Sequence, residues 1–379
     1  MKDWHLLENW QTSFEQFMQE YDNYFLRSET REKVNLYVRG ILANVERKNG
    51  WQLAESLGLS DPHPLQRLLS EAKWDADAVQ KRQREQVMSV LDDRAGVLVI
   101  DESGFPKKGK QSSGVSAQYC GRNGKVENCQ VAVYLTLATR SGTGFLDRRL
   151  YLPKSWSEDE QRREKAHIPE SLSFQTKPQL AQEMLEQVWS EGIQSPYVTG
   201  DSLYGNSPGL RQFIADANRL YVLGIGGHHH LEWLGKRQSI ADIIGLIEQD
   251  QWISMATTVA DTGVIWKDWC ALRILLKAND TNEQWLLIRR TQDDDPDYDF
   301  FISNAPIETT LTELAAVASM RHEIEQAFEE AKGQLGLADY EVRTWHAWHR
   351  HMTLCFLAHT WLMSISHEQR QKKTHSHAG

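Results

Sequence analysis

The stretch Val97-Leu98-Val99-Ile100-Asp101 decides the fold class, because an unbroken apolar run ends in a carboxylate. Short apolar runs of this kind are typical of strands that a sheet buries on both faces. A second run, Tyr197-Val198-Thr199-Gly200, is followed in the same way by Asp201. Two aspartates at the ends of buried strands predict a sheet that gathers acidic side chains at one place. Such carboxylates are suitable ligands for hard divalent cations.

The segments around these two runs predict an α/β core. Glycines 121, 124, 142 and 144 stand where turns are expected. The sequence Lys177-Pro178 opens a helix with proline in its first turn. The expected elements are strands at 97–101, 113–119 and 129–139, a helix from 177 to about 191, a strand at 197–201, a helix at 210–217 and a strand at 220–225. This order is that of a ribonuclease-H-like core.

Residues 1–92 predict an N-terminal helical domain. Large apolar residues from Trp10 to Phe25 recur at steps of three and four, which is the pattern of an amphipathic helix. Farther on, the segments 50–59 and 65–72 flank a turn, and the second segment carries Gln66 and Arg67. This arrangement can be a DNA-binding helix-turn-helix. A plain helical hairpin is the alternative.

The remaining chain divides into three parts. Residues 227–305 contain strand patterns with Asn- and Asp-rich turns and predict a mostly β insertion. Residues 306–365 return to helix and complete the ribonuclease-H-like core that begins with 93–226. The polar residues 366–379 are expected to form a flexible tail.

Composition excludes several classes of protein. The net charge of −10 is unfavourable for a nucleic-acid-binding protein, but residues 101–165 hold 12 Lys and Arg against 8 Asp and Glu. The four cysteines have no CxxC spacing, so neither a zinc ribbon nor a disulfide framework is expected. No apolar stretch reaches the length of a membrane span, and the start has no secretory signal. We therefore expect a cytoplasmic protein without membrane contact.

The segment from Arg321 to Lys332 predicts a helix with a polar face. Arg321, Glu325 and Lys332 lie along that face, beside an apolar stripe formed by Ile324, Phe328, Ala331 and Leu335. With Asp101 and Asp201, Glu325 would complete a set of three carboxylates for two cations that act on phosphodiesters. A solvated helix with an ion pair between Arg321 and Glu325 is the alternative.

Two other acids compete for places in this set. Glu102 adjoins Asp101, but neighbours on a strand point to opposite faces, so only one is expected to join the site. Glu329 lies one turn after Glu325 and could replace it. We favour Asp101 and Glu325 from their positions within the motifs given next.

Several motifs in order resemble a known family. The spacing of Arg321, Glu325 and Lys332 is similar to the signature helix of the insertion-sequence 4-like DDE transposases. More closely, the chain resembles the insertion-sequence 701 family from about residue 39 to about residue 362. The motifs that carry this resemblance are VLVIDESGFPKK at 97–108, VENCQ at 126–130, YLPKSW at 151–156, TGDSLYG at 199–205 and FEEAKGQLGLADYEVRTW at 328–345. The signature tyrosine of the family group, three residues before the arginine, is Ala318 here.

The resemblance implies a bacterial DNA transposase with a ribonuclease-H-like catalytic domain. It implies that Asp101, Asp201 and Glu325 bind Mg²⁺, for which Mn²⁺ could substitute, and that Arg321 and Lys332 hold DNA phosphates. The implied partners are double-stranded DNA, as terminal inverted repeats and target, and a second copy of the chain in a nucleoid-associated dimer. Lys107 and Lys108 could line DNA beside Asp101, or form an ordinary solvated turn.

Two other functions use the same residues. A host-adopted descendant would bind DNA or regulate without chemistry, and a metal-dependent nuclease would cut DNA without joining it. For the histidines 228–230 we favour a solvated loop over zinc, and for those at 346, 349 and 351 phosphate contact or packing. A tryptophan of the insertion (252, 266, 269 or 285) could stack on a base, although most tryptophans at strand spacing belong to the core.

Overall fold

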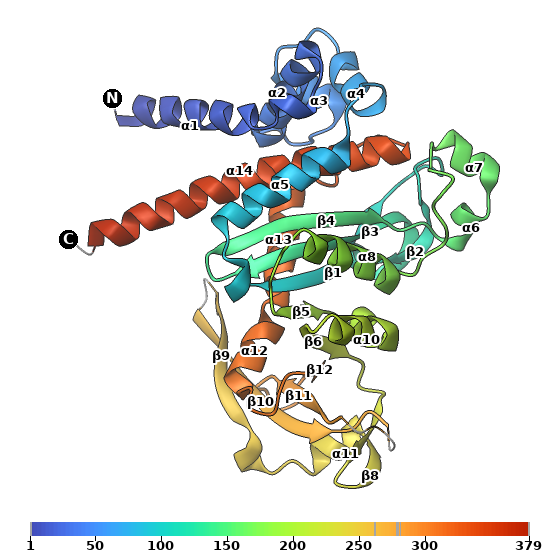
Figure 1. Ribbon diagram of the computed structural model, residues 1–379, viewed down its shortest axis with the longest axis vertical. Coiled ribbons are helices and arrows are strands. Elements are labelled where there is room, and N and C mark those ends of the chain that lie inside the picture. Colours follow the sequence, from blue (N-terminus) through green and yellow to red (C-terminus); the bar gives the residue numbers. More distant parts are fainter. Residues whose placement is uncertain (1, 261–262, 278–279, 281, 378–379) are drawn as a thin grey trace.

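The computed structural model describes residues 2–260, 263–277, 280 and 282–377. Five helices come first, a sheet with helices on both faces follows, and three helices end the chain (Figure 1). The helices are α1 Lys2–Gln19, α2 Ser28–Leu42, α3 Gly50–Ser56, α4 His63–Ser70, α5 Ala76–Val90, α6 Lys154–Ser157, α7 Glu160–Lys165, α8 Lys177–Ser190, α9 Ser202–Gly205, α10 Pro208–Asp216, α11 Ile240–Gly245, α12 Leu311–Ser319, α13 Arg321–Gln334 and α14 Trp345–His377. The strands are β1 Val97–Pro106, β2 Ser116–Cys120, β3 Lys125–Thr139, β4 Gly142–Leu150, β5 Tyr197–Gly200, β6 Leu220–Ile225, β7 His230–Trp233, β8 Lys236–Ser239, β9 Ile253–Ala260, β10 Gly263–Ile274, β11 Gln284–Arg290 and β12 Tyr298–Ser303.

The centre of the sheet has the ribonuclease-H-like topology that the sequence predicts. The strands lie in the order β4-β3-β1-β5-β6. The three strands β4, β3 and β1 are antiparallel, whereas β5 is parallel to β1 and β6 is parallel to β5. Helix α8 lies between β4 and β5 in the chain, and α9 and α10 connect β5 to β6. The expected fold class is therefore confirmed.

The mostly β insertion is also confirmed, and it extends the central sheet. Strand β12 pairs antiparallel with β6, and β11, β10 and β9 follow in turn. Only β7 and β8 form a separate small sheet within the described residues. Figure 1 shows these strands below the core, continuing from β6.

Alternation along β1 assigns its side chains to two different cores. Val97 and Val99 pack in the cluster that includes the buried residues of α13 and α14. Leu98 and Ile100 pack in the cluster that includes the buried residues of α8 and α10. Since side chains of a strand alternate between faces, Asp101 continues the α13 face and Glu102 continues the α8 face.

The N-terminal helices pack against the long helix α14, which lies alongside α5 (Figure 1). As the periodicity predicts, Phe14, Tyr21 and Phe25 are buried, although Trp10 remains 44% exposed. The predicted helix-turn-helix segment forms α3 and α4, with Gln66 and Arg67 exposed on α4. None of the described helices has both the length and the apolarity that a membrane span requires.

Three secondary-structure predictions need correction. Strand β4 was missed because Gly142 and Gly144 suggest turns. Gly144 instead lets α5 approach the sheet, since a Cβ there would lie 2.5 Å from Val87 Cγ1. Strand β9 of the insertion was missed as well. The helix α14 runs to His377, through most of the expected tail.

Candidate active site

Parallel pairing of β1 and β5 brings the two predicted aspartates together. Ile100 lies opposite Gly200, so the next residues, Asp101 and Asp201, are neighbours across the two strands. Asp101 is half-buried, and its Oδ1 accepts a hydrogen bond of 2.8 Å from the backbone N–H of Glu102. Asp201 is the N-cap of α9, where its Oδ1 accepts from the backbone N–H of Leu203 at 2.9 Å. Both carboxylates are thus oriented by backbone.

Glycines let α9 lie directly on the sheet. A Cβ at Gly205 would lie 1.7 Å from the carbonyl oxygen of Gly224 on β6, and a Cβ at Gly200 would lie 3.1 Å from the carbonyl oxygen of Ile100. The glycines of the TGDSLYG motif are therefore required by close backbone contact. This packing determines where Asp201 and Tyr204 point.

The helix α13 presents its polar face to the same place. Ile324, Phe328 and Ala331 are buried, as the apolar stripe predicts. On the exposed side, Arg321 Nη2 lies 3.2 Å from Glu325 Oε1, and Glu325 remains 48% exposed. The ion pair of the alternative interpretation, a solvated helix, therefore exists, and it lies at the edge of the site.

One cleft of about 720 Å³ collects these residues. It is lined by the three expected metal ligands, Asp101, Asp201 and Glu325, and by the two expected phosphate-binding residues, Arg321 and Lys332. The ammonium group of Lys332 lies 5.3 Å from the centre of the Phe328 ring and 6.0 Å from that of Phe105. The five side chains come from β1, the β5–α9 junction and α13.

The electrostatics of this cleft favour binding of a cation. Burial, together with the nearby carboxylates of Asp201 and Glu102, raises the pKa of Asp101 to about 7, although Arg321 opposes the rise. Burial and Glu102 likewise raise the pKa of Asp201, against Arg321 and the backbone hydrogen bonds from α9. Repulsion between carboxylates that are close together disfavours their ionised forms. A divalent cation between them would relieve this repulsion.

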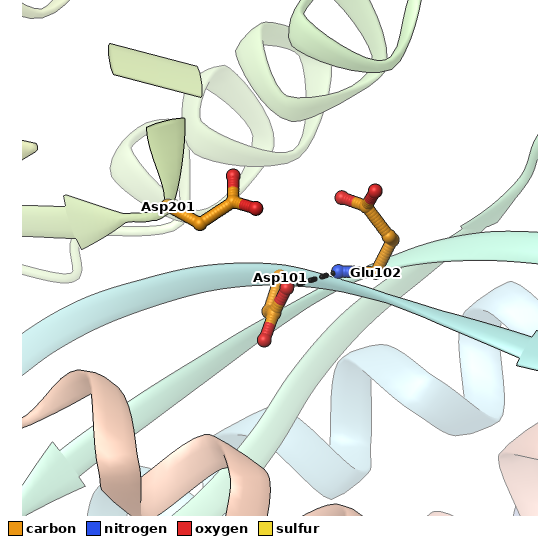
Figure 2. Close-up of side chains that lie close together, drawn as sticks. All are labelled: Asp101, Glu102 and Asp201. Atoms are coloured by element: carbon orange, nitrogen blue, oxygen red, sulfur yellow. Dashed lines mark hydrogen bonds between the residues drawn. The ribbon is translucent and has the colours of Figure 1, made fainter. Parts of the chain in front are cut away.

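A cluster of three acidic side chains includes Glu102, which was not among the predicted metal ligands. One oxygen each of Asp101, Glu102 and Asp201 lies within 4.8 Å of the others. In Figure 2, the carboxylates of Glu102 and Asp201 are on the same side of β1, and that of Asp101 points toward the other side. Asp101 and Glu102 thus point to opposite faces of β1, as expected of neighbours on a strand, yet Asp201 at the end of β5 lies near both.

Glu325 belongs to the cleft but lies outside this group of three. Its carboxylate interacts with Arg321 and, at 3.4 Å, with His322 Nδ1. Glu329 lines the same cleft, so the geometry does not separate these two candidates for the third acid.

The two lysines after β1 line a different hollow. Lys107 and Lys108 border a neighbouring cavity of about 460 Å³. Lys107 Nζ donates to the carbonyl oxygen of Tyr340 at 3.1 Å and lies 3.5 Å from the centre of its ring. Burial lowers the pKa of Lys107 to about 8. Lys108 is exposed.

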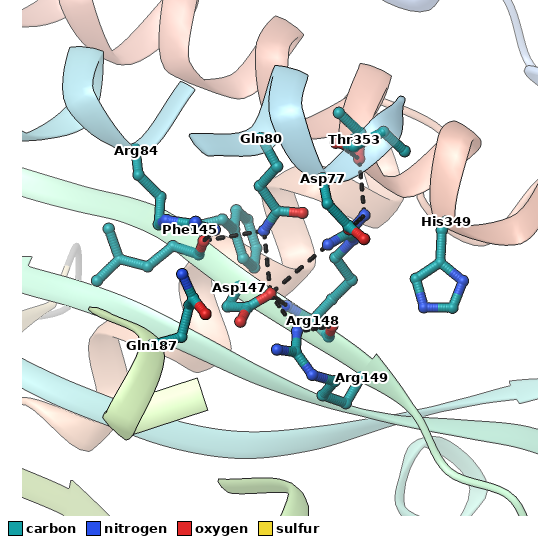
Figure 3. A network of polar contacts seen from close by, with 12 residues as sticks. Asp77, Gln80, Arg84, Phe145, Asp147, Arg148, Arg149, Gln187, His349 and Thr353 are labelled. Atoms are coloured by element: carbon teal, nitrogen blue, oxygen red, sulfur yellow. Dashed lines mark hydrogen bonds and ion pairs between the residues drawn. The ribbon is translucent and has the colours of Figure 1, made fainter. Parts of the chain in front are cut away.

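Other singled-out residues serve packing. Asp147 pairs with Arg149 at 2.6 Å, within the polar network between α5 and β4 in Figure 3. His349, next to that network, is half-buried, and desolvation of its ring lowers its pKa to about 3. His351 shares a hydrogen bond of 2.9 Å with Tyr37. The histidine at 229 shares one of 2.7 Å with Asn206.

The tryptophans of the insertion differ in exposure. Trp269 is fully buried, and Trp252 and Trp285 are half-buried. Trp266 on β10 is 52% exposed. It is therefore the one among these four that has a large exposed ring surface.

Comparison with known proteins identifies the family to which this chain belongs. The family model described as DDE superfamily endonuclease matches residues 20–233, which include Asp101 and Asp201. The chain belongs to this superfamily. A second family model, described as a transposase DDE domain, matches residues 175–361 and includes Glu325.

A relative and a solved structure resemble this DDE endonuclease. The chain is 24% identical, over 307 residues, to the probable transposase for insertion sequence element IS701 of Microchaete diplosiphon. The match covers 80% of this chain and 74% of the relative. Among solved structures, the piggyBac transposase synaptic complex with hairpin DNA matches with a TM-score of 0.47 and 11% identity, over 92% of this chain and 68% of that chain. By the two family models, the enzyme is of the DDE transposase and endonuclease type.

Proposed function

We propose that this DDE enzyme is a DNA transposase that cleaves the terminal inverted repeats of an insertion sequence and joins the 3′ ends to target DNA. The proposal rests on the cleft in which Asp101, Asp201, Glu325, Arg321 and Lys332 meet. Acids and bases in one cleft match the two demands of phosphodiester chemistry, which are cation binding and phosphate binding.

The donor set fits a hard divalent cation. Oxygens of Asp101 and Asp201 lie within 4.8 Å of each other, and Glu325 lines the same cleft. Oxygen-only ligands favour Mg²⁺ or Mn²⁺. Two such cations, when bound, stabilise the attacking and leaving oxygens of an in-line displacement. We assign Mg²⁺ as the physiological ion.

The side chains around the acids have separate tasks. Asp101 must give up the proton that its raised pKa favours before it can serve as a ligand. Arg321 is paired with Glu325 in the free enzyme and can exchange this partner for a DNA phosphate. Lys332, on the same helix, supplies a second positively charged side chain that can bind DNA phosphate. No covalent bond between protein and DNA is needed, because water and then the freed 3′-hydroxyl act as nucleophiles.

The remaining parts fit binding to double-stranded DNA. The exposed residues Gln66 and Arg67 on α4 would contact the repeat, and Lys108 would contact DNA beside the cleft. Joining two ends requires two active sites, so we expect a dimer on the bacterial nucleoid.

Cleavage of a labelled duplex that carries the gene's own flanking repeat tests this function. We expect nicking at the repeat boundary in Mg²⁺ and a loss of about 100-fold or more in Glu325→Gln, because a lost cation ligand removes several kcal/mol of transition-state stabilisation. DNA binding should persist. The matched control is Glu330→Gln, which removes the same charge from an exposed position of the same helix.

The same assay separates the other functions. DNA binding without cutting by the wild type would indicate a host-adopted regulator. Cutting without joining to a target plasmid would indicate a nuclease. Equal cutting by wild type and Glu325→Gln would remove Glu325 from the site and make Glu329 the third acid to test.

A further inference from the structure

Glu102 reaches the acidic cluster from the face of the sheet opposite to α13. Asp101 belongs to the same face as α13, whereas Glu102, which lines the same cleft, points toward α8 and α9. Asp201, at the end of β5, lies within reach of both acids. Figure 2 shows the carboxylates of Glu102 and Asp201 on the same side of β1.

Two side chains hold Glu102 in this position. Lys177 Nζ donates to Glu102 Oε1 at 2.8 Å, and the hydroxyl of Tyr204 donates to Glu102 Oε2 at 2.8 Å. Lys177 and Glu102 are 17% and 21% exposed, and Tyr204 is fully buried. Each carboxylate oxygen thus accepts one hydrogen bond from the protein and keeps a second lone-pair site.

The elements that supply these donors are themselves firmly placed. Lys177 is the first residue of α8, which begins with a capping box formed by Thr176 and Gln179. Tyr204 lies in α9, three residues after Asp201, and Gly205 packs against the backbone of β6. The ring of Tyr204 therefore has little freedom, and the orientation of Glu102 follows from it.

We propose that Glu102 is a further carboxylate ligand of the metal centre and that Lys177 and Tyr204 are positioning residues that orient it. This inference rests on the proposed function. It differs from a purely structural ion pair between β1 and α8, because that pair would not require the carboxylate to face Asp201. Residues that orient a metal ligand usually affect metal affinity by about 10- to 100-fold.

Binding of Mn²⁺ to the full-length protein tests the proposal without relying on catalysis. Free Mn²⁺ is measured by electron paramagnetic resonance during titration at pH 8. We expect Glu102→Gln to weaken binding at least tenfold and Tyr204→Phe, which removes only the hydroxyl group, to weaken it about tenfold. Glu330→Gln, which removes one exposed negative charge, should bind like the wild type.

Thermal unfolding of the same samples shows whether Glu102 is a metal ligand or only stabilises the fold. If Glu102 has only a structural role, Glu102→Gln will have a lower melting temperature and the same Mn²⁺ affinity as the wild type. This result would overturn the inference. If Glu102→Gln does not fold, Tyr204→Phe decides, and unchanged Mn²⁺ affinity in that variant would also overturn it.

Asp201→Asn separates this inference from the proposed function. Loss of Mn²⁺ binding in Asp201→Asn with normal binding in Glu102→Gln would remove only Glu102 from the centre. Equal Mn²⁺ binding by Asp201→Asn and wild type would contradict the metal site of the proposed function itself, and the role of Glu102 with it.

Discussion

Replacing Asp101 by asparagine should stabilise the metal-free protein while it abolishes the metal response. The fold raises the pKa of Asp101 from 3.8 to about 7, chiefly through burial. Below pH 4 the residue is protonated in both the folded and the unfolded chain and costs nothing. Between pH 4 and pH 7 the unfolded chain ionises first, so folding loses stability as pH rises, and above pH 7 the loss is complete.

The size of this loss follows from the two pKa values. A rise from 3.8 to about 7 corresponds to on the order of 4 kcal/mol at pH 8, because a tenfold change in acidity is worth about 1.4 kcal/mol. At pH 5 the loss is roughly a third of this value. Asp101 is not fully buried, so we expect about half of the full amount to be measurable. Asparagine can still accept the hydrogen bond from the N–H of Glu102.

Differential scanning calorimetry in EDTA measures the effect. About 2 kcal/mol predicts a rise of roughly 4 °C or more in the melting temperature of Asp101→Asn at pH 8, and a smaller rise at pH 5. Millimolar Mn²⁺ should then stabilise the wild type and leave the variant unchanged, because a ligand stabilises only the state that binds it. A variant that melts at or below the wild type at pH 8 in EDTA would contradict the raised pKa. Equal responses to Mn²⁺ would contradict the role of Asp101 as a ligand.

Three further predictions concern the supports of the site. Gly205→Ala forces a Cβ to within 1.7 Å of a backbone oxygen of β6 and should lower stability by about 1–3 kcal/mol or more in urea unfolding, whereas Gly245→Ala, which meets nothing within 4 Å, should be near neutral. Glu191→Gln breaks the nearly buried ion pair with Arg84 of α5, whose N–O distances are 2.7 and 2.6 Å, and should lower the free energy of unfolding by about 3 kcal/mol. Burial favours a higher pKa for Glu191, but the hydrogen bonds from Arg84 and Gln187 lower it, so the wild-type advantage is complete above the ordinary pKa of a glutamate and fades as the pH falls through the lowered pKa; an advantage that persists in acid would contradict the pair. Lys108→Met should weaken DNA binding without changing the melting temperature, while Lys107→Met should lower the melting temperature because its ammonium group lies on an aromatic ring; fluorescence anisotropy and thermal unfolding would show whether the two lysines differ in this way.

The chemistry-bearing elements of this enzyme could be predicted from the sequence because their signals are local. The apolar run before Asp101 indicates a buried strand, whatever lies beside it, and β1 includes this run and continues past Asp101 to Pro106. The three- and four-residue spacing that buries Ile324 and Phe328 likewise places Arg321 and Glu325 on the polar face of one helix. The order of the motifs predicted the DDE family, which the family models confirm.

Strand β4 shows where local signals fail. Gly142 and Gly144 have the composition of a turn, yet both lie in a strand. Gly144 is needed because Val87 of α5 occupies the space of a Cβ. Nothing in the neighbouring sequence reports a helix that packs from more than 50 residues away.

By itself, the sequence determined which residues form buried strands, which helix carries the polar face and which family the chain resembles, since these follow from periodicity and motif order. Only the tertiary structure decided that Glu102 joins Asp101 and Asp201, although it points to the other face of β1. It also decided that Lys107 lies on Tyr340, in a different cavity from the cleft of Asp101 and Asp201. The physical reason is that strand pairing and the packing of α8, α9 and α13 join residues far apart in the chain, and a local pattern cannot specify such contacts.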